Sequence, residues 1–288
     1  MAYVNILHGL TQSHAPATPS LKILILNLMP DRIKTERQFS KMLAHTTYNS
    51  TITFCIPQTH QFRHPEKGLY EKYVTFDQIR DQYYDALIVT GAAVDQLAFE
   101  KVDYWQELKE IIFWRHSHVK TSLFICWSAY AAGEIEHFFV GKKLEKKISG
   151  VYTVNGYTMP HSRYFTIPQQ NVDHDNLLAG NELLGAVIVR DISSASLYVT
   201  GHFEYLTNTL REEYYRDLKH DPTTPIPVNY FSKDLQATNT WEKSAVHFYQ
   251  NWLDGMFKPS FADFSSEQLF FKNFKTVKVN NTLQTKKG

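Results

Sequence analysis

Cysteine is scarce in this sequence, and a long apolar run is missing. Cys55 and Cys126 are the only cysteines among 288 residues, which is too few for a disulfide framework, and no Cys/His cluster has the spacing of a zinc site. No stretch approaches the roughly 18 consecutive apolar residues of a membrane helix. Residues 1–9 lack the basic leader of a secretory signal. These absences predict a soluble cytoplasmic protein without a bound metal, in which a cysteine stays a reduced thiol.

The sequence also has no excess of positive or negative charge. The net charge of +1 gives no field that would attract nucleic acid or a membrane surface. Hydrophobic residues make up 43% of the chain and charged residues 20%, a composition that can bury a large core. We therefore expect a globular protein that acts on small molecules, with neither nucleic acid nor membrane as a partner.

Short apolar runs alternate along the chain with stretches of helical spacing. The alternation predicts a doubly wound, mostly parallel α/β sheet, which binds ligands beyond the carboxyl ends of its strands. The chain becomes polar towards its end, so we expect a single α/β domain over residues 1–262 and a frayed tail over residues 263–288. Strands are expected at residues 21–29, 51–56, 86–90, 122–125, 186–189 and 196–200, and helices at 31–44, 76–82, 104–114, 127–137, 205–218 and 241–253.

Three of the expected strands are followed by residues that could take part in a reaction. Gly91, Cys126 and His202 each follow a strand, and the carboxyl ends of parallel strands meet at one edge of a sheet. A strand, a cysteine and an immediate helix form a nucleophile elbow, and the helix N-terminus favours the thiolate. The elbow lacks the usual glycines, so a buried core cysteine is the alternative for Cys126. Cys55, inside the run TITFC, is expected to be such a core residue.

His202 is followed two residues later by Glu204. On extended backbone, side chains two residues apart share a face, so the carboxylate can orient the imidazole and stabilise its charge. A His-x-Glu pair recurs by chance in proteins. Together with Cys126 at another strand end, however, it indicates a Cys-His-Glu triad.

A series of longer motifs, in order between residues 21 and 253, carries a resemblance to a known family. The motifs are LKILILNLMPDRIKTERQF, ALIVTGAAVDQLAFEKVDYW, LFICWSAYAA, SGVY, PHSRY, VTGHFEY and NYF. They resemble the homoserine O-succinyl/acetyltransferase family, also called homoserine transsuccinylase. That family is related in fold to the class I glutamine amidotransferases, so the resemblance implies the same α/β fold. It also suggests a homodimer.

The resemblance implies an acyl-transfer reaction at the triad. Cys126 occupies the position of the acyl-thioester nucleophile, His202 that of the general base and Glu204 that of its orienting partner. No bound cofactor is implied, because acetyl-CoA would be a co-substrate. Thiolate attack on the thioester would give an acetylated Cys126 in a ping-pong reaction, and general-base help from the histidine is typically worth about 10²–10⁴ in rate.

The resemblance also implies that further residues of this chain bind substrate. Lys147 and Ser162 match residues that contact substrate, and Arg216 matches an arginine whose fork can pair with the acceptor's carboxylate. Without the resemblance, Lys147 and Arg216 would be taken for solvated surface charges. For the developing oxyanion, the backbone N–H of Trp127 and the loop at Ala92 are the candidate donors.

The chain departs from the family pattern at two places. Asp95 stands where succinyl-transferring members have Gly and acetyl-transferring members Glu, and a carboxylate there would repel a succinyl group, so acetyl-CoA is the expected donor. The segment TVNGYTM before His161 is shorter than usual. In the family this segment lies near the acceptor, so the resemblance implies a remodelled pocket that favours L-serine. L-homoserine, with an acetyl or a succinyl donor, stays the alternative, because one methylene in a pocket is worth only about 1–3 kcal/mol.

Two other classes of function stay open on the sequence. An amidotransferase-like hydrolase would share the Cys-His-Glu triad, although the glycine-flanked elbow is absent. A non-catalytic binding module is the third reading. The presence of Cys126, His202, Glu204, Lys147 and Arg216 together argues against it.

Overall fold

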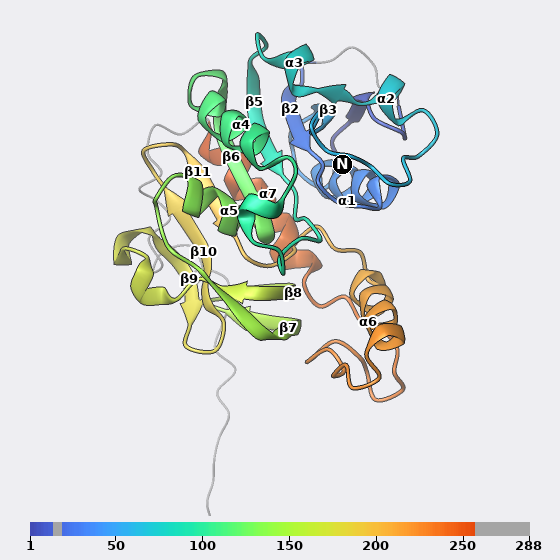
Figure 1. Cartoon of the computed structure of the whole chain (residues 1–288), viewed down its shortest axis with the longest axis vertical. Helices are drawn as coiled ribbons and strands as arrows, with labels where there is room; N and C mark the ends of the chain where they lie inside the picture. The colour runs from blue at the N-terminus through green and yellow to red at the C-terminus, as the bar shows by residue number, and fades with distance from the viewer. Residues whose placement is uncertain (14–18, 257–288) are drawn as a thin grey trace, which may run out of the picture.

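A mostly parallel sheet forms the centre of the protein (Figure 1). The computed structural model describes residues 1–13 and 19–256, and within them this sheet has nine strands. They are β1 (Val4–His8), β2 (Leu21–Leu26), β3 (Ser50–Ile56), β4 (Val74–Thr75), β5 (Tyr84–Val89), β6 (Val119–Ile125), β9 (Leu177–Asn181), β10 (Gly185–Asp191) and β11 (Ser196–Val199). Their order is β1-β3-β2-β5-β6-β11-β10-β9, with β4 beside β3. Within the described residues only β10 runs against the other strands of this sheet, pairing antiparallel with both β9 and β11.

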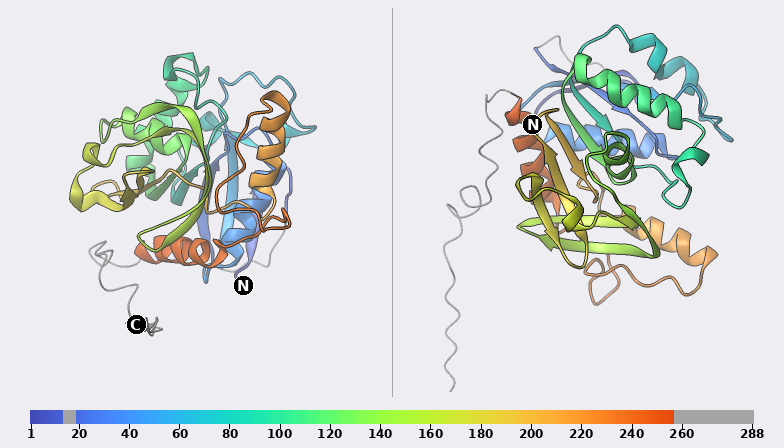
Figure 2. Two further views of the ribbon diagram at one scale, coloured as in Figure 1. Left: turned by 90° about the horizontal axis from the view of Figure 1, so that it is seen from below. Right: turned by 60° about the vertical axis from the view of Figure 1, so that its left-hand side comes forward.

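Helices cover both faces of the sheet (Figure 2). The helices are α1 (Arg32–Ala44), α2 (Leu69–Lys72), α3 (Phe76–Ile79), α4 (Trp105–His118), α5 (Trp127–Ile135), α6 (Thr209–His220) and α7 (Glu242–Gly255). In β2, Ile23 and Ile25 join the core beneath α1 and α7, whereas Leu24 and Leu26 join the core beneath α4 and α5. The alternation explains why this strand is apolar throughout. None of the helices in the described part of the chain is long and apolar enough to cross a membrane.

The α/β fold expected from the sequence is confirmed, with shifted element ends. The clearest shift is the helix expected over residues 205–218, since α6 begins only at Thr209. Tyr205 is held outside the helix because its carbonyl accepts a hydrogen bond from Trp241 Nε1 at 3.0 Å and its ring stacks on His202. The expected tail over residues 263–288 lies outside the described residues.

A two-stranded hairpin was not expected from the sequence. It consists of β7 (Lys142–Val154) and β8 (Tyr157–Thr166), which pair antiparallel. Its first strand is rich in charge and half-exposed, so it has no apolar run to reveal it. Asn155 and Gly156 form the turn with positive φ of 48° and 83°, the pair of conformations that a two-residue hairpin turn requires.

The junction of β6 and α5 is fixed by a buried hydroxyl. Cys126 occupies this junction with φ 53° and ψ −117°, a backbone conformation that costs a non-glycine residue about 1–3 kcal/mol. Ser128 Oγ accepts the N–H of Ile125 at 2.8 Å and donates to the carbonyl of Val89 at 2.7 Å. The hydroxyl therefore joins β5, β6 and α5 around the strained cysteine.

We expect Ser128→Ala to lower the free energy of unfolding by about 1–3 kcal/mol, because it leaves a buried N–H and a buried carbonyl without a partner. Urea unfolding followed by circular dichroism measures this. Ser117→Ala is the matched control, since Ser117 is exposed and, in the part of the chain that the structure describes, its hydroxyl bonds only to Trp114 and His118 of the same helix. Equal stability of the two variants would contradict the bracing role.

Candidate active site

Three neighbouring strands bring their following residues together. In the sheet β5 pairs with β6, and β6 with β11, all parallel. A Cβ placed on Gly91 would lie 3.2 Å from Cε1 of His202 and 3.4 Å from Cβ of Cys126. Gly91 thus lies directly against both residues, and its missing side chain makes room for them. The meeting of these strand ends, expected from the sequence, is found in the structure.

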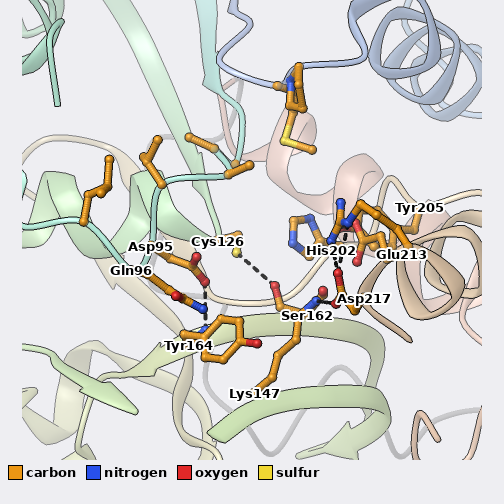
Figure 3. Close-up of a pocket in the computed structure, with 18 residues that line it drawn as sticks. Asp95, Gln96, Cys126, Lys147, Ser162, Tyr164, His202, Tyr205, Glu213 and Asp217 are labelled. Atoms are coloured by element: carbon orange, nitrogen blue, oxygen red, sulfur yellow. Dashed lines mark hydrogen bonds and ion pairs between the residues drawn. The ribbon is translucent and has the colours of Figure 1, made fainter. Parts of the chain in front are cut away.

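His202 is bound to Glu204 and interacts with Cys126, and Figure 3 shows His202 and Cys126 at one pocket. Nδ1 of His202 lies 2.7 Å from Oε1 of Glu204. The side chains of His202, Glu204 and Cys126 are all buried. Phe203, between the pair, stacks on Phe248 at 4.5 Å between ring centroids. Because Phe203 packs into the core, the imidazole of His202 and the carboxylate of Glu204 lie on the other side, with Cys126. This is the arrangement of a Cys-His-Glu triad.

The charge state of His202 is set by its two neighbours. Burial lowers the pKa of His202, but the Cys126 sulfur and the Glu204 carboxylate outweigh burial and raise this pKa well above its ordinary value. The protonated imidazole therefore stabilises the fold fully below its ordinary pKa of about 6.5. That contribution is lost as the pH rises through the raised value. In cysteine enzymes a neighbouring histidine is the usual group that activates the sulfur.

A cavity of about 450 Å³ opens over the cysteine. The loop after β5, the hairpin β7–β8 and α6 form its walls. Most residues that the sequence singled out line it, namely Ala92, Asp95, Cys126, Lys147, Ser162, His202 and Arg216. Glu204 lies behind His202, and the side chain of Trp127 is buried in the core.

The candidate oxyanion donors remain a prediction that the geometry permits. The first hydrogen bonds of α5 run from the N–H groups of Ala129 and Tyr130 to the carbonyl of Cys126, at 3.0 and 3.3 Å. The N–H of Trp127 comes earlier in the helix and has no intrahelical acceptor. Ala92 lines the same cavity as Cys126, and Trp127 directly follows the cysteine in the chain.

One wall of the cavity carries a cluster of charges on β7 and α6. Asp217 binds two cations, with Oδ2 lying 2.6 Å from Nζ of Lys147 and Oδ1 2.8 Å from Nη2 of Arg216. Burial raises the pKa of Asp217, but the two cations outweigh it and lower this pKa. Glu213, one helical turn before Arg216, accepts a hydrogen bond from Tyr205 Oη at 2.6 Å. Its other oxygen, Oε2, is buried and has no partner among the described residues.

Sequence reasoning identified Arg216 but missed Glu213, Asp217 and Tyr205. A usable signal was present, since Glu213, Arg216 and Asp217 have the i, i+3, i+4 spacing that places side chains on one helix face. The ring of Tyr205 stacks on His202 with centroids 4.1 Å apart. Because Tyr205 also bonds Glu213, it connects the triad to the charged wall.

Asp95 lies on the opposite side of the cavity, in the loop after β5. Its Oδ2 accepts the backbone N–H of Tyr164 at 2.8 Å (Figure 3). Burial raises the pKa of Asp95, although the N–H of Tyr164 and the charge of Lys147 oppose that shift. The carboxyl group therefore sits inside the cavity and is fixed to β8.

The short segment before His161 lies away from this cavity. Its residues, 153–159, form the hairpin turn, and none of them lines the cavity. Asn155 Oδ1 accepts the N–H of Gly180 at 3.1 Å, and the N–H of Thr158 donates to Ser244 Oγ at 3.0 Å. The turn thus packs against β9 and α7. The expectation that this segment shapes the acceptor pocket is wrong. The preference for L-serine depended on that expectation and therefore has no structural support.

The fold places the chain in the class of glutamine amidotransferase-like α/β proteins. A glutamine amidotransferase from Thermotoga maritima superposes with a TM-score of 0.55 at 12% identity, over 83% of this chain and 99% of that one. Another from Methylobacillus flagellatus gives 0.52 at 11% identity, over 82% and 94%. At such low identity the likeness concerns the fold alone.

Sequence comparison defines the family. The homoserine O-succinyltransferase family model matches residues 7–259. The homoserine O-acetyltransferase of Leuconostoc mesenteroides subsp. mesenteroides is 44% identical over 247 residues, covering 81% of each chain. That of Bacillus licheniformis is 39% identical over 256 residues, covering 81% of this chain and 84% of the relative. The chain belongs to the homoserine O-succinyltransferase family and is an acyltransferase.

We expect Glu204→Gln to lower the pKa of His202, because the neutral amide no longer favours the imidazolium. Near about pH 7 the thiol of Cys126 should then react with iodoacetamide about tenfold more slowly. Peptide mass spectrometry at a series of pH values measures the rate. Cys55 serves as the internal control, because burial raises the pKa of its thiol and keeps it unreactive. An unchanged pH profile at Cys126 would show that the carboxylate does not control the imidazole.

Proposed function

We propose that the protein is a homoserine O-acetyltransferase that carries the acetyl group on Cys126. The observation that carries the proposal is one cavity that holds Cys126, His202 and the charged wall of α6, in a chain whose relatives are named homoserine O-acetyltransferases. Those names support L-homoserine, the alternative acceptor from the sequence, over L-serine. They connect the protein to methionine biosynthesis. A homodimer in the cytoplasm stays a prediction of the sequence.

The first half-reaction transfers the acetyl group from acetyl-CoA to the enzyme. The Cys126 thiolate attacks the thioester carbonyl, and the N–H groups of Trp127 and Ala92 stabilise the oxyanion that develops. When the intermediate collapses, the bond to the CoA sulfur breaks. The imidazolium of His202 supplies the proton that this sulfur needs. One thioester replaces another, so the step is nearly neutral in energy.

The second half-reaction transfers the acetyl group to the acceptor. His202 removes the proton of the acceptor hydroxyl as its oxygen attacks the acetyl carbon, and the Cys126 thiolate leaves. Glu204 holds the imidazole in place and stabilises the positive charge that it gains. Tyr205 covers one face of the ring, which keeps the imidazole aligned through both steps.

The charged wall suits an amino acid as the acceptor. Arg216 binds Asp217 through Nε and Nη2, and the Nη1 side of its guanidinium faces the acceptor's carboxylate in this proposal. The unpartnered Oε2 of Glu213 suits the α-ammonium group. Asp217 holds Lys147 and Arg216 in position through its two ion pairs. The amino and carboxyl groups would thus bind at α6, and the side-chain hydroxyl would point towards Cys126. Ser162, whose carbonyl lies 3.9 Å from the sulfur, borders the space between.

Acetyl-CoA and L-homoserine, added in turn, test the proposal directly. We expect acetyl-CoA alone to add the mass of one acetyl group to the protein and L-homoserine to remove it. Cys126→Ala should remain unmodified, whereas Cys55→Ala, the matched control, should be acetylated. The second-step kcat/KM should be about 10–100-fold higher with L-homoserine than with L-serine, because one methylene decides how far the hydroxyl reaches.

The alternatives give different results in the same experiment. Faster turnover with L-serine would restore the serine reading. Release of CoA and free acetate without any acceptor would indicate a hydrolase. No modification by acetyl-CoA or succinyl-CoA would indicate a binding module and defeat the proposal.

The acyl donor is tested at Asp95. We expect Asp95→Gly to raise kcat/KM for succinyl-CoA about tenfold or more, because it removes a carboxyl group that fills space and repels the succinyl carboxylate. The rate of CoA release with L-homoserine measures this. Asp234→Gly, at an exposed loop position, is the matched control. If succinyl-CoA use is the same in both variants, Asp95 does not select the donor.

A further inference from the structure

A second cavity adjoins the one over Cys126. It has a volume of about 460 Å³ and lies between the segment after β3 and the loop around η1 (Phe99–Lys101). Val94 and Leu97 line both cavities. Leu97 is 46% exposed and forms the ridge between them. A long ligand could therefore occupy both spaces by crossing this ridge.

The second cavity holds cations that are available to an anion. Arg63 and Lys101 line it, both are exposed, and within residues 1–13 and 19–256 neither has a carboxylate at ion-pair distance. Asp103, the acidic residue of this cavity, is already engaged by His60 Nδ1 at 2.8 Å and by the N–H of Gln61 at 3.1 Å. The cations of the first cavity, in contrast, are bound to Asp217. Phosphate groups would thus be attracted to the second cavity.

Aromatic rings form another part of this cavity. His60 meets Phe62 and Tyr104 edge-on, with ring centroids 4.3 and 5.3 Å apart, and all three line the space. Planar rings next to cations are the features with which proteins hold a nucleotide base and its phosphates.

The ridge itself is held in position by the hairpin. Lys143 of β7 donates from Nζ to the carbonyls of Gln96 and Leu97, at 3.0 and 2.7 Å. The same loop carries Asp95, which is fixed to β8. The loop that separates the two cavities therefore also presents the Asp95 carboxyl group to the cavity over Cys126.

We propose that the second cavity binds the adenosine phosphate part of the acyl-CoA donor. Arg63 and Lys101 face its phosphates, and the pantetheine arm crosses Val94 and Leu97 to bring the thioester to Cys126. The amino-acid acceptor then enters from α6 on the other side. This inference rests on the proposed function, because it takes an acyl-CoA to be the donor.

Donors with and without the nucleotide test the proposal. We expect the double variant Arg63→Ala/Lys101→Ala to acetylate Cys126 from acetyl-CoA with a kcat/KM about tenfold lower, since two charge contacts with phosphate are lost. With acetyl-pantetheine, which lacks the adenosine phosphates, the double variant and the wild type should react alike. Lys243→Ala is the matched control, because Lys243 is exposed on α7 and lines neither cavity.

Binding of adenosine 3′,5′-bisphosphate gives a readout independent of acyl transfer. Calorimetry with the full-length Cys126→Ala protein should show binding that weakens about tenfold when Arg63 and Lys101 are also replaced. Unchanged binding, or equal losses with both acetyl donors, would overturn the inference. If neither donor acetylates the wild type, the proposed function fails, and the calorimetry still decides whether the second cavity binds the nucleotide.

Discussion

The close approach of Gly91, Cys126 and His202 is the contact on which the active site depends. It exists because β5, β6 and β11 are parallel neighbours, so the residues that follow them leave the sheet at the same edge. A side chain at Gly91 would press on both reactive groups. The sheet thus supplies the positions, and the strained backbone at Cys126, braced by Ser128, turns the sulfur into the cavity.

Electrostatics connect this contact to the rest of the site. The imidazole of His202 lies between the sulfur and Glu204, and these two groups outweigh burial to keep it positively charged. Burial, followed by the Glu213 carboxylate, raises the pKa of Tyr205, so its hydroxyl remains a donor to Glu213. Tyr205 thus contacts His202 through its ring and Glu213 through its hydroxyl. It therefore connects the His202–Glu204 pair to the charged wall, where an amino acid would bind.

In the proposed reaction, the two cavities would serve two sides of the cysteine. The acceptor side is built by α6 and the hairpin, whose charges are arranged around Asp217. The donor side is built by the loop after β5, which carries Asp95 and borders the cavity with Arg63 and Lys101. Acceptor and donor would then reach the same sulfur from opposite directions, as two half-reactions at one nucleophile require.

The α/β class, the strand ends and the spacing of His202 and Glu204 could be predicted from the sequence, because buried parallel strands are continuous apolar runs and local spacing survives folding. The hairpin β7–β8 escaped prediction, since a charged, half-exposed strand has no such run. Tertiary structure alone decided where the turn at Asn155 lies, and its packing against β9 and α7 removed the argument for L-serine. It alone also brought Glu213 to Tyr205 and a second cavity to Leu97. These contacts join residues far apart in the chain or on separate elements, and only the packing of the sheet, the hairpin and the helices sets such distances.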